Sequence, residues 1–250
     1  MRAPCYLLIV LPWLAALPLK AQDLAATCHA SSSYDVTLAP GSLQFDRQAP
    51  APLHVTIAAG SLRTDGTAVP LNAEDRDRLE LFERNLRALA PRVRAVAQNG
   101  VDITVQGLRA EVDGMGLSAS ARAEFDRRLT AHAQELKRRI AASRSSRDWQ
   151  GDAANQYANQ IAADLLPILA ADLGQQALNA ALAGDMQAAG DLRDRATSMA
   201  TDLEPRLQRR LQVLRPQVQA LCPAIKRLAE LQQGLRDASG RPLSLLRVGS

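Results

Sequence analysis

The fold is decided by residues 72–96, which read NAEDRDRLELFERNLRALAPRVRAV. Apolar side chains recur there at intervals of three or four positions: Leu79, Phe82, Leu86, Leu89, Val93 and Val96. This interval places them on one face of a helix, in the heptad-like pattern of helices that pack against one another. Asn72 is a good N-cap, and Glu74 and Asp75 put negative charge where it favours the helix dipole. A long helix is therefore predicted to begin at Asn72, with Pro91 lying off the apolar face and bending it.

Helical spacing continues toward the C-terminus. Residues 97–112 fit both an alternating strand and a helical face, and we favour a helix that ends in the glycine-rich break at 113–116. A second helix is expected over 118–142, followed by a polar break at 143–151. A third helix is expected to start near Asp152, to be interrupted at Pro167 and to end at Gly184; Leu173, Leu178 and Leu182 lie in its second half.

The last helical pattern is the most extended in the chain. Apolar residues repeat at intervals of three or four from Ala196 to Leu228. We expect one helix here, the longest of the fold, bent but not ended by Pro205, Pro216 and Pro223. Residues 239–250 are expected to form a flexible tail.

The segment before residue 72 has the period of strands. Alternating apolar residues mark strands over 34–38, 42–46 and 53–57, with Leu53, Val55 and Ile57 expected on one face. A further pair of strands is expected within 61–71, joined at Asp65-Gly66, a dipeptide suited to a tight hairpin turn. Such short strands form a thin sheet that needs helices to cover one face.

These patterns predict an α+β fold that is mostly α. A small N-terminal antiparallel β-sheet packs on long antiparallel, coiled-coil-like helices. The expected organisation is a signal peptide over 1–21, a β-sheet region over 22–71, a long-helix bundle over 72–238 and the tail over 239–250.

The N-terminus has the three parts of a bacterial secretory signal. Basic Met1-Arg2 is followed by an almost wholly apolar run over 4–19 and by polar Lys20-Ala21-Gln22-Asp23. The run contains two prolines and is shorter than the roughly 20 residues of a membrane span, which disfavours the alternative of an uncleaved anchor. We expect Sec-dependent export, cleavage near Ala21 and a periplasmic location.

The charge of the chain limits the classes of partner. Removal of Arg2 and Lys20 with the signal lowers the formal net charge from +4 to +2. This near-neutral balance implies no polyanionic partner, and export further disfavours nucleic acid.

Two cysteines remain after the signal, Cys28 and Cys222. In an oxidising compartment we favour a disulfide between them over the alternative of a reactive Cys28 thiol, which would need a lowered pKa and a nearby base.

The sequence contains little that indicates catalysis. His29, His54 and His132 have no partner at metal-ligand spacing, and neither a phosphate-binding loop nor a nucleophile motif stands out. We therefore expect no catalytic residues, no metal and no cofactor. His132 is interpreted as a packed or flanking residue on an apolar helix face.

Residues 122–147 are locally basic. Candidate contacts to an anionic lipid surface are Arg127, Arg128, Lys137, Arg138 and Arg139. The simpler interpretation, a solvated face of a bundle, is favoured.

The layout of the chain resembles a known family. The features that carry the resemblance are Cys28 opening a strand-rich segment, the run 35–38, the hairpin at Gly66, the helix start at 71–73, Pro91 and a closing helix with Cys222. Together they resemble the YggN-like family of Gram-negative periplasmic proteins, a domain of unknown function. The resemblance implies a periplasmic location and a disulfide between the two cysteines, and it brings no catalytic residues.

The function expected from the sequence is therefore that of a non-enzymatic interaction or scaffold protein of the cell envelope, with chaperone-like binding as one form of it. Its partners would be other envelope proteins, and its oligomeric state is open. Two alternatives are a lipid- or amphiphile-binding module that uses an amphipathic helical face and, less favoured, an enzyme.

Overall fold

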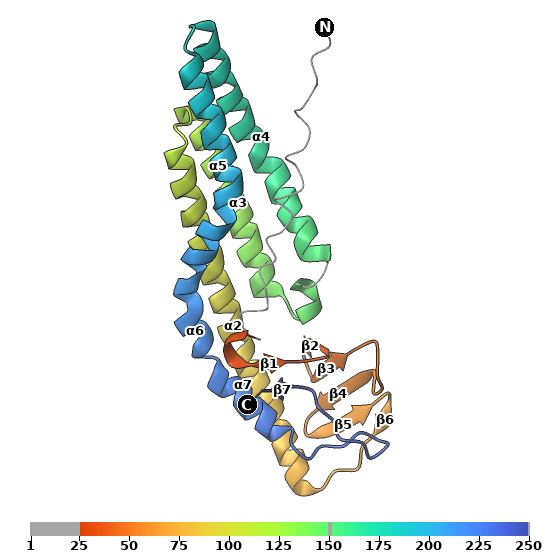
Figure 1. Cartoon of the computed structure of the whole chain (residues 1–250). Coiled ribbons are helices and arrows are strands. Elements are labelled where there is room, and N and C mark those ends of the chain that lie inside the picture. Colours follow the sequence, from red (N-terminus) through yellow and green to blue (C-terminus); the bar gives the residue numbers. More distant parts are fainter. Residues whose placement is uncertain (1–25, 150–151, 250) are drawn as a thin grey trace. The chain divides into compact units, whose positions relative to one another are not determined.

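The structure is a computed structural model that describes residues 26–149 and 152–249 (Figure 1). It confirms a mostly helical α+β protein with a small antiparallel sheet near the N-terminus. The described residues form two compact units. The sheet unit comprises residues 26–98, 139–149 and 214–249, and the bundle unit comprises 99–138 and 152–213. The predicted signal peptide, 1–21, lies outside the described residues.

The sheet is a five-stranded antiparallel meander with neighbouring strands in chain order. Its strands are β2 (Asp35–Ala39), β3 (Ser42–Asp46), β4 (His54–Ala58), β5 (Ser61–Thr64) and β6 (Thr67–Ala68). The predicted hairpin turn is confirmed, because Asp65 and Gly66 both have positive φ, +48° and +81°. A type I′ turn needs positive φ at both central positions, and glycine adopts it without steric cost.

One face of the sheet is apolar and buried. Leu43, Phe45, Val55, Ile57 and Leu62 line it, as alternation along the strands requires. Leu53 was expected on this face but is 36% exposed. It precedes β4 and its backbone N–H donates to Asp65 Oδ1 at 2.7 Å, so it belongs to the end of the hairpin and not to the apolar face.

The free edge of β2 is covered by the polar segment that follows α3 (Ala119–Ala142) and includes η1 (Ser146–Trp149). Leu38 N–H donates to the Arg144 carbonyl at 2.8 Å, and Val36 N–H donates to Ser146 Oγ at 3.0 Å. An uncovered edge strand is a template for pairing with other chains, so this cover protects the sheet.

Helix α2 (Ala73–Gly114) covers the apolar face with its first turns. The predicted N-cap is confirmed, since Asn72 Oδ1 accepts a hydrogen bond from Asp75 N–H at 2.7 Å. Leu79 and Phe82 are almost fully buried in the core of the sheet unit. Residues 97–112 are helical, as favoured, and the helix continues through Pro91 to the predicted break.

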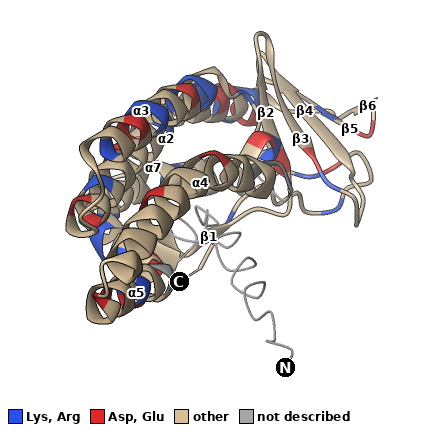
Figure 2. Ribbon diagram, turned by 90° about the horizontal axis from the view of Figure 1, so that it is seen from above, with Lys and Arg blue, Asp and Glu red and all other residues tan. Residues whose placement is uncertain are grey.

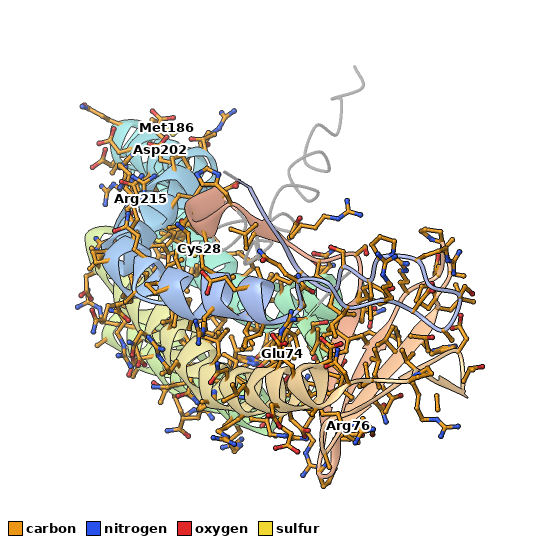
Figure 3. All side chains as sticks on the ribbon, turned by 90° about the horizontal axis from the view of Figure 1, so that it is seen from below. Cys28, Glu74, Arg76, Met186, Asp202 and Arg215 are labelled. Atoms are coloured by element: carbon orange, nitrogen blue, oxygen red, sulfur yellow. A yellow bond between two sulfur atoms is a disulfide. The ribbon has the colours of Figure 1, made fainter. Side chains whose placement is uncertain are left out.

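The other cover comes from the end of the chain. Helices α6 (Arg215–Gln219) and α7 (Cys222–Leu231) belong to the sheet unit, and Ile225 and Leu228 enter the same core. Cys28 and Cys222 form a disulfide with Cα atoms 5.2 Å apart, which confirms the predicted pairing. Figure 3 shows Cys28 beside the C-terminal helices. Next to it, β1 (Ala30–Ser31) pairs with β7 (Arg247–Val248).

The expectation of a flexible tail over 239–250 differs from the structure of residues 239–249. Leu245 is only 1% exposed, and the backbone N–H groups of Leu245 and Leu246 donate to Gln232 Oε1 at 2.8 and 3.0 Å. The buried Gln232 amide also donates to the Leu246 carbonyl. The tail is held because its leucines fill the core and one glutamine satisfies its backbone.

The bundle unit is built from the end of α2, the first part of α3, and helices α4 (Asp152–Leu182) and α5 (Met186–Leu211). Its core contains Phe125 and Leu129 from α3, Leu165 and Leu169 from α4, and Leu192 from α5. The domain boundaries predicted at residues 71 and 238 therefore differ from the compact units, because α2 and α3 each contribute to both units.

Two predictions about proline were wrong. Helix α4 is continuous through Pro167, whose exposed position lets the helix lose one backbone hydrogen bond without burying an unpaired group. The last helix is not continuous and is not the longest: α5, η2 (Gln212–Leu214), α6 and α7 follow one another. Pro216 and Pro223 lie in the first turns of α6 and α7, where no intrahelical N–H bond is needed, so they begin new helices.

Gly107 marks a close approach of α2 and α5 within the bundle unit. A Cβ atom added at Gly107 would lie 2.6 Å from Leu207 Cδ2, and Leu207 is almost fully buried. Contacts this short force the neighbour to move, and a packed core resists such movement. Glycine is therefore required here by space and not by backbone conformation.

Cys28→Ser and Cys222→Ser should each destabilise the protein. The disulfide joins residues 194 positions apart, and the chain-entropy model gives roughly 5 kcal/mol as an upper figure for so long a loop. Denaturant unfolding should show that the double variant is no less stable than either single variant, and maleimide should label both thiols only after reduction. Additive losses of stability would show that the two cysteines act separately.

Gly107→Ala should destabilise the bundle unit by about 1–2 kcal/mol, because the overpacking cost exceeds the gain in helix propensity. Gly190→Ala in α5 is the matched control, since nothing lies within 4 Å of the added Cβ, and it should be neutral or stabilising. Thermal unfolding of the two variants distinguishes them, and equal melting temperatures would contradict the close approach.

Candidate functional site

The turn between α4 and α5 is closed by its own backbone. Asp185 N–H donates to the Ala180 carbonyl at 2.9 Å and Gly184 N–H donates to the Ala181 carbonyl at 3.1 Å. Gly184 has φ +81°, so this is a Schellman C-cap. Asp185 then caps α5 by accepting from Ala188 N–H at 2.9 Å. The turn is thus specified locally by Gly184 and Asp185.

Apolar side chains are exposed at this turn. Leu182 is 78% exposed and Met186, labelled in Figure 3, is 71% exposed. We call residues 182–186 the hairpin tip. Farther from the turn on the same two helices, Leu173 of α4 and Leu192 of α5 are buried in the core of the bundle unit. Leu173, Leu178 and Leu182 lie in the second half of α4, as predicted, and of these Leu178 is 53% exposed.

Helix α4 also differs from its neighbours in charge. It contains no lysine or arginine, and its only charged residues are Asp152, Asp164 and Asp172. Figure 2 shows α4 almost wholly tan, whereas α3 carries both blue and red segments. The α4 surface is therefore the least charged helical surface of the bundle unit.

Asp164 is the centre of a polar cluster between α3 and α4. Its Oδ1 accepts from Arg128 at 2.5 Å, and its Oδ2 lies 2.9 Å from His132 Nε2. Tyr157 of α4 donates its hydroxyl to the His132 carbonyl at 3.1 Å. Hydrogen bonds from His132 and Arg128 lower the pKa of the Asp164 carboxyl below its ordinary value. Both carboxylate oxygens are engaged, so the cluster joins two helices.

Asp172 plays a similar part further along α4. Its carboxylate accepts from the backbone N–H of Ser118 at 3.0 Å, from the Ser118 hydroxyl, and from Gln176 Nε2 at 2.6 Å. The hydrogen bonds from Ser118 lower the pKa of this carboxyl. Both acidic groups in the middle of α4 therefore anchor the helix to the segment around α3.

The predicted basic residues lie along α3 and are matched by acidic partners. Arg127 and Arg128 both bind Glu124, with closest distances of 2.7 and 2.5 Å. Lys137 pairs with Asp102 at 2.8 Å and Arg138 pairs with Glu135 at 2.7 Å. Arg139 is exposed near the end of α3 and is likewise not without a partner. The local excess of positive charge in the sequence is thus largely compensated within the fold.

A hollow of about 600 Å³ lies where α2 ends and α3 begins. Val112, Leu117 and Phe125 line it and belong to the core of the bundle unit. Its charged lining residues are paired with one another, Arg109 with Asp126 at 2.6 Å and Arg122 with Asp113 at 3.3 Å. The charged side chains that line the hollow therefore neutralise one another.

Two further observations concern the described residues alone. No three His, Cys, Asp or Glu side chains among them are grouped so that they could hold a metal ion. None of their helices combines the length and apolar character that crossing a bilayer requires.

Fold and surface together define a class: a disulfide-linked α+β protein with long helices, one of which, α4, carries little charge. The chain belongs to the family described as "Protein of unknown function (DUF2884)", whose model matches residues 28–242. This confirms the family resemblance predicted from the sequence. No curated protein and no solved structure matches the chain.

Sequence reasoning missed the contact between His132 and Asp164. The sequence indicated that His132 lies on the apolar face of one predicted helix and that Asp164 lies on the next, but it gave neither residue a partner. Periodicity can indicate that both residues turn toward other helices, but it does not tell which helix faces which. The hairpin tip was missed for the same reason.

Asp164→Asn should reduce the stability of the protein at neutral pH. It should also reduce the loss of stability that the wild type shows as the pH falls. Because folding lowers the pKa of Asp164, its stabilisation is fully present above the ordinary value of 3.8 and is lost as the pH falls through the lowered pKa. Melting temperatures between pH 2.5 and 7 test this, with Asp191→Asn on the exposed side of α5 as control. If the melting temperature of Asp164→Asn falls at low pH as steeply as that of the wild type, the expectation is contradicted.

Proposed function

We propose that this chain is a periplasmic, non-enzymatic interaction protein of the bacterial cell envelope, which binds apolar segments of other proteins at the hairpin tip. The observation that carries the proposal is the exposure of Leu182 and Met186 on either side of the same turn. Large apolar side chains grouped on a surface mark interaction sites more often than single exposed ones do. Chaperone-like binding is the form of interaction that this tip suits.

The chemistry of the tip favours weak and adaptable contacts. Covering an exposed Leu or Met side chain is worth about 1.5–3 kcal/mol, and the cost of association reduces this sum. A site of two such side chains holds a partner only briefly unless further contacts form. Methionine, unbranched and polarizable, accommodates partners of different shape. Short-lived contacts with varied apolar segments are what a chaperone-like protein requires.

Two features support the periplasmic location. The predicted export signal occupies residues 1–21, and the disulfide is of the kind that persists in oxidising compartments. Cell fractionation tests this part of the proposal: the mature protein should appear in the periplasm with its N-terminus near Gln22. Recovery of the chain from the cytosol would contradict it.

The hydrogen bonding of the two acidic groups in the middle of α4 also supports a binding role over a catalytic one. Asp164 and Asp172 hold helices together through all the partners described above, and such engaged carboxylates suit a structural role. The alternative of anionic lipid binding is weakened by the pairing of Arg127, Arg128 and Arg138 with glutamates, because each pair must open before the cation meets a phosphate.

Replacing both Leu182 and Met186 with glutamine should weaken binding of an unfolded protein at least about tenfold, since the apolar surface is lost while the helices keep good helix formers. The probe is fluorescently labelled, reduced and carboxymethylated α-lactalbumin, with affinity measured by anisotropy. Val213→Gln is the matched control, because Val213 is 69% exposed and lies away from the tip.

Equal affinity of the double variant and the wild type would overturn the proposal. The same proteins are then tested for flotation with phosphatidylglycerol vesicles. Flotation that is lost in Arg127→Gln/Arg138→Gln but kept in the tip variant would replace the proposal with the lipid-binding alternative.

A further inference from the structure

Within the bundle unit, the hairpin of α4 and α5 reaches beyond the turn that joins α2 to α3 (Figure 1). Gln176 Nε2 of α4 donates to the carbonyl of Gly116 in that turn at 3.2 Å, and Arg195 Nη1 of α5 lies 3.5 Å from a Cβ atom added at Gly116. We call residues 177–194, which lie between these two contacts, the outer hairpin. From Gln176 to its end at Leu182, α4 rises by about 9 Å.

The outer hairpin carries a net negative charge. Its charged residues are Asp185, Asp191, Arg193 and Asp194, so three acidic groups and one basic group give a formal charge of 1 − 3 = −2. Asp185 caps α5, and the other three make no ion pair with any residue that the structure describes. The last turn of α4 contains no basic residue. The negative end of the α4 dipole, equivalent to about half a charge, is therefore not compensated by a cation of its own helix.

The acidic charge lies next to the exposed apolar side chains. Asp185 stands between Leu182 and Met186 in the chain, and these two side chains are 78% and 71% exposed. Arg193 follows Met186 by seven positions, about 10 Å along the helix. That distance exceeds the Debye length of about 8 Å at physiological salt, so the charge of Arg193 is largely screened at the hairpin tip. A segment that covers the tip thus meets a carboxylate and not a cation.

The sign of this charge limits what can cover the hairpin tip. A second copy of the chain would bring the same carboxylates to the contact, and like charges placed together cost free energy. An anionic lipid surface would be repelled in the same way. A peptide with Lys or Arg beside its apolar residues meets opposite charge instead. Its cation can also donate to the carbonyl groups at the end of α4, where basic side chains are favoured.

We propose that the protein segments bound at the hairpin tip are cationic, that is, short apolar stretches with Lys or Arg directly beside them. The inference rests on the proposed function and names its class of partner. Leu182 and Met186 supply apolar contact for any such stretch, and Asp185 selects among stretches by their charge. Charge complementarity of this kind contributes to specificity and association rate more than to affinity, which fits a site of weak contacts.

Fluorescently labelled peptides with one shared apolar centre, flanked on both sides by Lys, Gln or Glu, test the proposal by anisotropy. The Lys-flanked peptide should bind the mature protein about tenfold more tightly than the Glu-flanked peptide at low salt, and added salt should reduce this ratio. The mature chain has a formal charge of +2, which by itself favours the Glu-flanked peptide. A preference for Lys therefore reports the local charge of the outer hairpin.

The variant Asp185→Asn/Asp191→Asn tests the source of the preference, because it changes the formal charge of the outer hairpin from −2 to −2 + 2 = 0. Asn caps a helix about as well as Asp, so the turn should keep its structure, and circular dichroism should show unchanged helix content. The affinity ratio of the Lys- and Glu-flanked peptides should fall to about threefold or less. Asp77→Asn, at an exposed position of α2 in the sheet unit, is the matched control and should keep the wild-type ratio.

Equal affinity for the Lys- and Glu-flanked peptides would overturn this inference. So would a preference for Lys that survives in Asp185→Asn/Asp191→Asn. In either case the proposed function stands if Leu182→Gln/Met186→Gln weakens the binding of all the peptides. If the wild type binds none of the peptides, the proposed function is overturned and this inference with it.

Discussion

The sheet unit depends on the burial of one apolar sheet face. Five short strands cannot stabilise themselves with that face open to water, and Leu43, Val55 and Ile57 are covered only because two helical segments pack on them. One is the start of α2, which follows the sheet directly. The other is α7 with the leucines of the tail, which comes from the other end of the chain. The disulfide and the pairing of β1 with β7 hold the two ends together at this point.

The bundle unit also buries its apolar surface, but it does so by packing helices on one another. Its helices bury one leucine-rich core, and polar contacts such as Asp164 with Arg128 and His132 fix their alignment. The requirement for glycine at position 107 shows how closely two of the helices approach. Asp164 and Asp172 of α4 bind partners on and around α3, and the exposed positions of α4 over 156–181 carry no charge.

The parts of the fold that local signals specify could be predicted from the sequence. Asn72 marked the start of α2, Asp65-Gly66 marked a hairpin, and Gly184 marked the end of α4, because each of these acts on its own backbone. The parts that depend on distant partners could not. The periodicity around Pro216 and Pro223 is the same in one bent helix and in successive helices. Gln232 reaches the backbone of Leu245 and Leu246, a contact that no spacing reveals. The basic stretch over 122–147 likewise suggested a charged surface, because the sequence does not show that Asp102 lies against Lys137.

The separation in sequence between the two covers of the sheet also determines the order in which the chain can fold. Residues 30–71 supply the strands, yet Ile225, Leu228 and Leu245 are needed to complete the core beneath them. A chain that emerges from a ribosome or a translocation channel N-terminus first exposes its strands long before these residues appear. Contacts across so many residues carry a high loop-closure cost and form late. The sheet unit therefore stays incomplete until nearly the whole chain has emerged, and only then do Cys28 and Cys222 come within bonding distance. Formation of the Cys28–Cys222 disulfide therefore marks the final stage in the folding of the sheet unit.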